Sequence, residues 1–331
     1  MLMDMHYSST SQERYVLFYA IAHSLTYSHT HLLIKVILQR MNFKKKVYDI
    51  KFSPDDTHFA VTYGNGCQIW KTPGIQREFA PLVLTRTLSG LHDASSCLDW
   101  SSDSNSLIIG SKDLTAKIFY RIKSKHMAST VLTGHRDKVV NVFFGSDDDT
   151  AYTVASDGAV FTWQFEYGDR VQIEKKKKFK KENDDMDDED DVDDDDDEEE
   201  DEEDNDQNIK TKRGGKWILA SREFLWDPHS RVISAAFNKV NGLLVVGFNT
   251  GVFGLYSMPG CTNIHKLSVS HHSLNTISIN STGEWIAVGS SRLGQLLVWE
   301  WQSESYVLKQ QGDYLPYISY ILTRSLTHVH L

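Results

Sequence analysis

The sequence is poor in the residues that organise disulfide-bonded domains and zinc sites. It has three cysteines among 331 residues, Cys67, Cys97 and Cys261, and no two of them form a C-x-x-C pair. This spacing excludes a disulfide framework and a cysteine zinc site, and it is typical of a protein in a reducing compartment. A chain of this length buries a sizeable core without such cross-links.

Motifs for nucleotide binding and hydrolysis are also missing. The glycines at 64–66 and 214–215 lie outside the G-x-x-x-x-G-K-[ST] frame that holds phosphates, and no G-x-S-x-G sequence exposes a nucleophile. The histidines, including the pair His271-His272, do not combine with cysteines or carboxylates at metal-ligand spacing. The sequence therefore predicts no enzyme, no cofactor and no small-molecule substrate.

One apolar stretch, residues 15–38, has the composition of a membrane span. Three histidines and Lys35 interrupt it, and Asp4 and Glu13 precede it, where a signal peptide carries positive charge. We therefore expect residues 1–43 to be an N-terminal segment outside the repeats described below, with no membrane anchor.

Negative charge is concentrated in one run. The net charge is −10, but residues 182–206 hold 21 Asp and Glu and no Lys or Arg. The remaining 24 acidic residues face 35 basic ones, so the rest of the chain carries a net charge of +11. A basic body favours nucleic-acid phosphates or acidic partners, and the acidic run favours basic proteins.

The acidic run lies inside a low-complexity insertion, residues 166–216. Basic runs at 175–181 and 210–216 flank it, and its few apolar residues cannot offset the entropy of folding, so we expect disorder. The basic runs are either a solvated loop or a nuclear import signal that also makes loose contacts with RNA. The candidate residues are Lys175, Lys176, Lys177, Lys178, Lys180, Lys181, Lys212 and Arg213.

From residue 47 onward, five stretches of the chain align with one another. Each reads as strand, polar turn, strand, a turn rich in Asp, Asn or Gly, and a third strand that ends on an aromatic residue. The stretches are 47–70, 95–119, 139–163, 232–256 and 274–299. Their strand-end aromatics are Trp70, Phe119, Trp163, Tyr256 and Trp299, at spacings of 49, 44, 93 and 43 residues.

This spacing predicts the architecture. A period of about 40–45 residues with four strands per repeat is typical of a β-propeller, and the spacing of 93 is one repeat plus the insertion. We therefore predict an all-β WD40 propeller over residues 44–312, partial or open, with about five to six blades. The strand-end aromatics should anchor its core. The insertion follows Trp163, so it should leave the third matching blade between that blade's third and fourth strands.

The third stretch carries the fullest set of repeat features. Gly134-His135 comes first, Asp157-Gly158 follows, and Trp163 stands six residues after Asp157. This pattern resembles the WD-repeat family, and the resemblance implies a buried hydrogen-bond network of His135, Thr153, Asp157 and Trp163. The same residue types could be mistaken for a hydrolase triad. We expect them instead to hold one blade together, because buried polar groups must find partners.

Three further strings narrow the resemblance to one branch of that family. They are CLDWSSDSNSLIIGSKD (97–113), TPGIQREF (72–79) and GQLLVWEWQSESYVLKQQG (294–312). They are similar to members that are subunits of the UTP-B complex in the small-subunit processome, a ribonucleoprotein particle. The resemblance implies a non-catalytic scaffold for ribosome biogenesis in the nucleolus, acting in rRNA processing and small-subunit rRNA maturation. It implies other WD-repeat subunits of that complex as partners, and precursor rRNA and small nucleolar RNA as direct or indirect partners.

Both ends of the chain depart from this branch. Residues 1–43 and the tail 313–331 do not match it, so we interpret the chain as a fragment or an alternative gene product. One alternative function is a generic WD40 protein-interaction adaptor in another nuclear complex, since its repeats would look the same. A second alternative, an enzyme with its active site at the propeller mouth, needs convergent titratable groups that the sequence does not offer.

Overall fold

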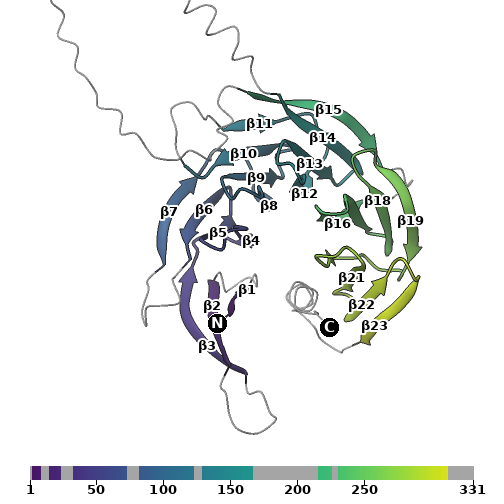
Figure 1. Ribbon diagram of the computed structural model, residues 1–331, viewed down its shortest axis with the longest axis horizontal. Coiled ribbons are helices and arrows are strands. Elements are labelled where there is room, and N and C mark those ends of the chain that lie inside the picture. Colours follow the sequence, from purple (N-terminus) through teal and green to yellow (C-terminus); the bar gives the residue numbers. More distant parts are fainter. Residues whose placement is uncertain are drawn as a thin grey trace, which may run out of the picture.

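The fold is built from β-strands that form six antiparallel sheets (Figure 1). The structure is a computed structural model that describes residues 2–8, 15–23, 33–72, 82–122, 129–166, 215–225 and 230–311. Five sheets have four strands each, and within each sheet neighbouring strands are also neighbours along the chain. We call these five sheets blades 1 to 5. The three-stranded sheet that precedes them is the N-terminal sheet.

The strand boundaries of the blades are as follows. Blade 1 contains β4 (Val47–Phe52), β5 (His58–Tyr63), β6 (Gly66–Lys71) and β7 (Val83–Leu88). Blade 2 contains β8 (Ser95–Trp100), β9 (Ser106–Ser111), β10 (Ala116–Tyr120) and β11 (Thr130–Leu132). Blade 3 contains β12 (Val139–Phe144), β13 (Thr150–Ala155), β14 (Ala159–Glu166) and β15 (Lys216–Phe224). Blade 4 contains β16 (Val232–Asn238), β17 (Leu243–Phe248), β18 (Val252–Ser257) and β19 (Thr262–Ser268). Blade 5 contains β20 (Thr276–Ile279), β21 (Trp285–Ser290), β22 (Gln295–Glu300) and β23 (Ser305–Gln311).

The blades stand side by side around a common axis, with their first strands innermost (Figure 1). Successive first strands contact one another from β4 through β8, β12 and β16 to β20. The fourth strands lie on the outside of the same view. The described sheets form an arc that begins at the N-terminal sheet and ends at blade 5, which confirms the predicted partial WD40 propeller.

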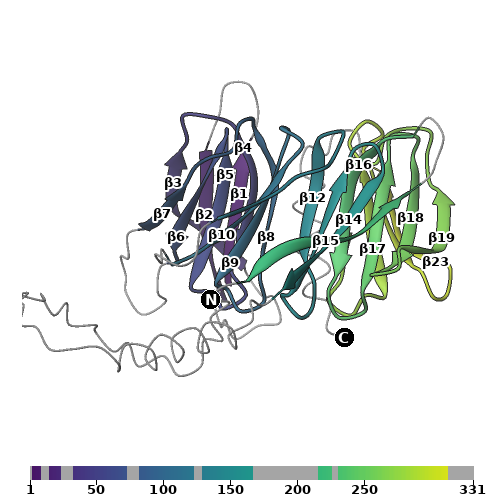
Figure 2. The same ribbon diagram turned by 90° about the horizontal axis from the view of Figure 1, so that it is seen from above.

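In the side view the strands run up and down, so the turns gather at the upper and lower ends of the strands (Figure 2). One end carries the turns that join the first and second strands of each blade, and we call it the turn end. These turns span 53–57, 101–105, 145–149, 239–242 and 280–284. Their Asp, Asn, Ser and Gly residues suit them to tight turns, because these side chains cap the backbone or tolerate positive φ.

Apolar clusters lie between neighbouring blades. Ile69 of blade 1 packs in one cluster with Trp100 of blade 2, and Ile118 of blade 2 packs in another with Phe165 of blade 3. Two more clusters join blade 3 to blade 4 and blade 4 to blade 5. A single four-stranded sheet would leave both faces in water, so the burial of apolar area between blades is what makes them stack.

The N-terminal sheet was not predicted. Residues 1–43 were expected to lie outside the blades, but they contain β1 (Leu2–Ser8), β2 (Tyr15–His23) and β3 (Leu33–Asn42), paired in that order. Two of these strands come from the apolar stretch 15–38. A continuous apolar run is compatible with a buried strand, but it lacks the Asp and Gly turns that marked the other repeats.

The charged insertion enters and leaves blade 3 between its third and fourth strands. Glu166 at the end of β14 pairs with Lys216 at the start of β15. Residues 167–214, the 313–331 tail and the eight candidate basic residues lie outside the described part of the chain. Within the described part, no helix is long and apolar enough to cross a membrane.

Candidate interaction site

A short chain of hydrogen bonds runs through the interior of blade 3. The indole Nε1 of Trp163 donates to Oγ1 of Thr153 at 3.0 Å, and the same oxygen lies 2.6 Å from Nε2 of His135. His135 is 6% exposed and Thr153 is 0% exposed. Three of the four predicted network residues therefore meet, and Thr153 is closed to any substrate. A hydroxyl with these partners and this burial ties strands together and does not act as a nucleophile.

The predicted place of Asp157 in this network needs a correction. Its carboxylate accepts a hydrogen bond from the backbone of Ala159 at 3.1 Å, so it caps the turn between β13 and β14. Nδ1 of His135 is buried and has no hydrogen-bond partner among the described residues. Burial lowers the pKa of His135 to about 4, although the nearby charge of Asp157 opposes that effect. The imidazole is therefore neutral at physiological pH.

This histidine is part of a stack of three side chains. The rings of His135 and Phe161 are 4.0 Å apart and almost parallel, and the guanidinium of Arg222 lies 5.4 Å from the centre of the Phe161 ring. Gly134 has a φ of +131°, a backbone angle that residues with a Cβ rarely adopt. A Cβ at Gly134 would lie 3.4 Å from the Phe161 ring, so the backbone passes close to the stack.

Four of the five strand-end aromatics are buried in the inter-blade clusters. Phe119, Trp163, Tyr256 and Trp299 are each 7% exposed or less. Trp70 is only partly buried, and its Nε1 has no partner among the described residues. It packs in the cluster that covers the first face of blade 1, next to Phe43 and Phe59. That cluster also includes Met41 of β3, so it reaches the N-terminal sheet.

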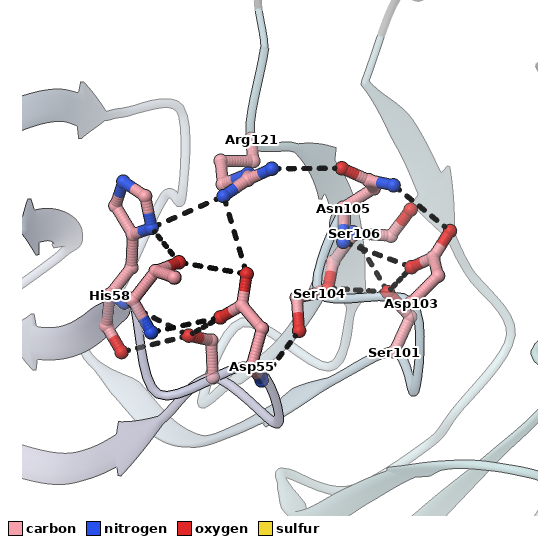
Figure 3. Close-up of polar contacts among 10 residues, drawn as sticks. Asp55, His58, Ser101, Asp103, Ser104, Asn105, Ser106 and Arg121 are labelled. Carbon is pink, nitrogen blue, oxygen red and sulfur yellow. Dashed lines mark hydrogen bonds and ion pairs between the residues drawn. The ribbon is translucent and has the colours of Figure 1, made fainter. Parts of the chain in front are cut away.

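The turn end carries a polar cluster that the sequence did not single out (Figure 3). The turns of blades 1 and 2 begin at Ser53 and Ser101. Each serine hydroxyl donates to the backbone carbonyl of the first residue of the next strand. The two turns are joined where the backbone N–H of Asp55 donates to Oγ of Ser104 at 3.1 Å. A comparable link joins blades 2 and 3, where the backbone of Ser102 donates to Asp148.

Arg121 fills the space between blades 1 and 2 at this end (Figure 3). Its guanidinium lies 3.7 Å from the Asp55 carboxylate, 3.1 Å from Nδ1 of His58 and 3.2 Å from the Asn105 side-chain oxygen. Burial raises the pKa of Asp55, but hydrogen bonds from neighbouring side chains and the charge of Arg121 outweigh it and hold that pKa below its ordinary value. Burial and Arg121 lower the pKa of His58. The arginine therefore acts as a polar wedge between two blades.

A group of charged side chains joins blades on the inside of the arc. The ammonium of Lys51 on blade 1 lies 3.1 Å from the Asp99 carboxylate on blade 2, and that of Lys239 on blade 4 lies 3.6 Å from it. Lys239 also donates to the carbonyl of Trp100 at 2.9 Å. Asp99 in turn accepts the backbone N–H of Phe144 on blade 3. Four blades therefore meet at one carboxylate, a link that sequence spacing could not reveal.

Two equivalent side chains on the first strands also link neighbouring blades. The carboxylate of Asp49 accepts the backbone N–H of Leu98 at 3.0 Å, and the side-chain oxygen of Asn141 accepts that of Ala235 at 3.0 Å. Burial raises the pKa of Asp49, opposed by the charge of Lys51. These links keep the polar backbone of the inner strands paired from blade to blade.

The three cysteines are free thiols. Burial raises the pKa of Cys97 to about 12 and that of Cys261 to about 11, and it raises the pKa of Cys67 as well. Thiols of this kind are poor nucleophiles because the reactive thiolate is suppressed. In the part of the chain that the structure describes, no three His, Cys, Asp or Glu side chains are grouped to hold a metal ion.

Comparison with known proteins agrees with this geometry. The family described as WD domain, G-beta repeat matches residues 83–119, which run from β7 through β10 and so take one strand from blade 1 and three from blade 2. Such an offset is expected when a sequence repeat spans two structural units. The chain contains a WD repeat and is similar to periodic tryptophan protein 2.

Several curated relatives carry that name, three of which are described here. The chain is 40% identical over 290 residues to the periodic tryptophan protein 2 homolog of Schizosaccharomyces pombe. This match covers 86% of the chain and 30% of that protein. It is 42% identical over 281 residues to periodic tryptophan protein 2 of Saccharomyces cerevisiae, with 84% and 28% covered. For the mouse homolog the identity is 37% over 294 residues, with 86% and 32% covered. The chain therefore spans about a third of the length of the relatives it matches.

Proposed function

We propose that the chain is a non-catalytic scaffold in ribosome biogenesis, as a component of the small-subunit processome and its UTP-B complex. Its similarity to periodic tryptophan protein 2 over about 85% of its length carries this proposal. The described blades support a binding role, because the carboxylates of Asp49 and Asp99 on the first strands already accept hydrogen bonds from the next blade. The histidine and threonine most easily mistaken for catalytic groups are buried against Trp163.

The proposed partners are other WD-repeat subunits of that complex, with precursor rRNA and small nucleolar RNA bound directly or through those subunits. The basic body of the chain, with a net charge of +11 outside the acidic run, supports contact with RNA phosphates. The proposed location is the nucleolus, and the basic runs at 175–181 and 210–216 are the candidate import signal.

The experiment is affinity purification of the tagged full chain from cells, followed by sedimentation and RNA sequencing. We expect the chain to sediment with particles that contain small-subunit precursor rRNA. Replacing Lys175–Lys178, Lys180, Lys181, Lys212 and Arg213 by glutamine should move the chain into the cytoplasm. A wild-type chain that stays cytoplasmic, with no precursor rRNA in its purification, would contradict the proposal.

A generic WD40 adaptor in another nuclear complex is the alternative that shares this structure. The two functions differ in what co-purifies, because the blades themselves would look the same. A chain that co-purifies with nuclear proteins but gives no RNA crosslinks at any salt concentration favours the adaptor. RNA crosslinks that are lost steeply as salt rises favour the processome scaffold.

A further inference from the structure

Equivalent positions meet at each interface between two blades, near the turn end. One is the residue before the strand-end aromatic, and a second is its partner on the fourth strand. The third lies two residues after the strand-end aromatic of the next blade. The third residue always donates its backbone N–H to the carbonyl that precedes the second strand of its own blade. These pairings identify the sets Ile69, Arg86 and Arg121; Ile118, Thr130 and Phe165; Thr162, Ser221 and Met258; and Leu255, His265 and Trp301.

Three of the four interfaces receive a large side chain from the next blade. Arg121 fills the first, with Arg86 donating to the carbonyls of Tyr120 and Arg121. Phe165 packs against Trp217 and the apolar cluster between blades 2 and 3. Trp301 packs against the cluster between blades 4 and 5 and donates to the carbonyl of Gly283 at 2.7 Å.

The interface between blades 3 and 4 has smaller residues at the same positions. Thr162 stands in place of isoleucine or leucine, Ser221 in place of arginine, threonine or histidine, and Met258 in place of arginine, phenylalanine or tryptophan. A groove of about 790 Å³ opens there, and its lining includes these three residues with Asp147, Tyr152 and Phe237. Val240 on its rim is 82% exposed.

Two observations point to a ligand for this groove. Thr162 is only 5% exposed, and its Oγ1 is buried without a hydrogen-bond partner among the described residues. A buried hydroxyl left unpaired costs free energy that a bound donor or acceptor would recover. The three neighbouring interfaces, by contrast, have an apolar side chain at the position of Thr162.

The charge of the groove indicates what it would bind. Asp147 is equivalent to Asp55, the carboxylate beside Arg121 in the first interface, since each lies two residues after the start of its turn. The hydrogen bonds that Asp147 accepts from Thr150 and Asp149 all use Oδ1. Glu223 adds a second carboxylate to the lining. The one lysine there, Lys239, turns its ammonium toward Asp99 and the Trp100 carbonyl of blade 2.

We propose that the groove between blades 3 and 4 binds an arginine side chain carried by an extended segment of a partner protein, in the position that Arg121 occupies between blades 1 and 2. The guanidinium pairs with Asp147, its methylenes lie against Tyr152, Phe237 and Met258, and a polar group of the segment reaches the Thr162 hydroxyl. A planar guanidinium suits such a site because it pairs with carboxylates and stacks on aromatic rings. This names a partner chemistry for the proposed scaffold role and rests on it.

The test uses the full chain with ¹³C-methyl-labelled methionine and N-acetyl-arginine N-methylamide as the probe. Met258 lines the groove, and the Met258→Leu variant assigns its methyl signal. We expect the Met258 methyl shift to saturate with the arginine probe and to stay unchanged with the citrulline analogue, which has nearly the same shape but no charge. A saturating shift with citrulline or with the leucine analogue, or no saturating shift with arginine, would overturn the proposal.

Matched variants separate this site from general charge effects. Asp147→Asn should weaken the arginine probe about fivefold to tenfold, whereas Asp56→Asn on the blade 1 turn should leave its affinity unchanged. Ser221→Arg places the chain's own arginine in the groove and should abolish binding, whereas Ser268→Arg on the exposed end of β19 should not. Equal affinity for wild type, Asp147→Asn and Thr162→Val would sink the proposal even if Ser221→Arg failed to fold.

The arginine-binding experiment is independent of the experiment that tests the scaffold role. Loss of arginine binding with precursor rRNA still co-purifying counts against the groove alone. A chain that binds arginine but never enters pre-ribosomal particles counts against the proposed function instead.

Discussion

The Oγ1 atom of Thr153 lies 2.6 Å from Nε2 of His135, deep inside blade 3. The two residues come from different places in the repeat, one from the loop that enters the blade and one from its second strand. Since Trp163 donates to the same oxygen, one hydroxyl joins a loop and two strands. Loss of that hydroxyl should therefore be felt in all three segments.

Thr153→Val should lower the free energy of unfolding by about 2–3 kcal/mol, because two buried polar groups lose their shared partner while the shape is retained. Chemical denaturation followed by tryptophan fluorescence measures the change. Thr85→Val, at an exposed position on β7, is the matched control and should stay close to wild type. A Thr153→Val chain as stable as the control would mean that the hydrogen bonds contribute little.

The chain should lose stability as pH falls from 6.5 toward 4. Burial holds the pKa of His135 at about 4 in the folded chain, below its ordinary value of 6.5, so the unfolded chain binds more protons in this window. The loss attributable to His135 should reach roughly 2 kcal/mol at pH 5. Denaturation midpoints measured between pH 7 and 5 give this slope.

His135→Gln should flatten that slope, whatever it does to stability at pH 7. His271→Gln, at an exposed position, should retain the wild-type slope. If both variants kept the wild-type pH dependence, the titrating group would have to lie elsewhere.

Asp99→Asn should destabilise the arc by about 1–2 kcal/mol in low salt, because two lysines lose their common counter-charge while the asparagine oxygen still serves Phe144. Both ammonium groups are partly exposed, so the difference from wild type should shrink as sodium chloride is added. Asp56→Asn, at an exposed turn position, should show neither effect. A salt-independent difference would point to lost packing instead of lost charge.

Trp163→Ala should cost about 3–5 kcal/mol, because a 5% exposed indole is replaced by a cavity between blades 2 and 3. Tyr306→Ala removes a ring that is 51% exposed and should change the melting temperature little. Differential scanning calorimetry of both variants distinguishes them. Similar melting temperatures for the two would contradict the buried role of Trp163.

Sequence reasoning predicted the repeated blades well because their signals are local. Turn residues, alternating apolar positions and a strand-end aromatic recur within each repeat, so the sequence pattern placed Trp163 and Trp299 in the core, where both are buried. The same reasoning missed β2 and β3, which begin in an apolar run without Asp or Gly. It also placed Asp157 in the buried network, although its carboxylate caps a turn.

The sequence alone determined the blade pattern, the position of the insertion within blade 3 and the likeness to a WD-repeat branch, because each depends on residues close together in the chain. Only the tertiary structure decided that Lys239 of blade 4 reaches Asp99 of blade 2 and that Thr162, Ser221 and Met258 leave a groove where three other interfaces are filled. Those relationships depend on which side chains face each other from separate blades. Repeat spacing fixes where a residue stands in its own blade but carries no information about the size of the side chain opposite.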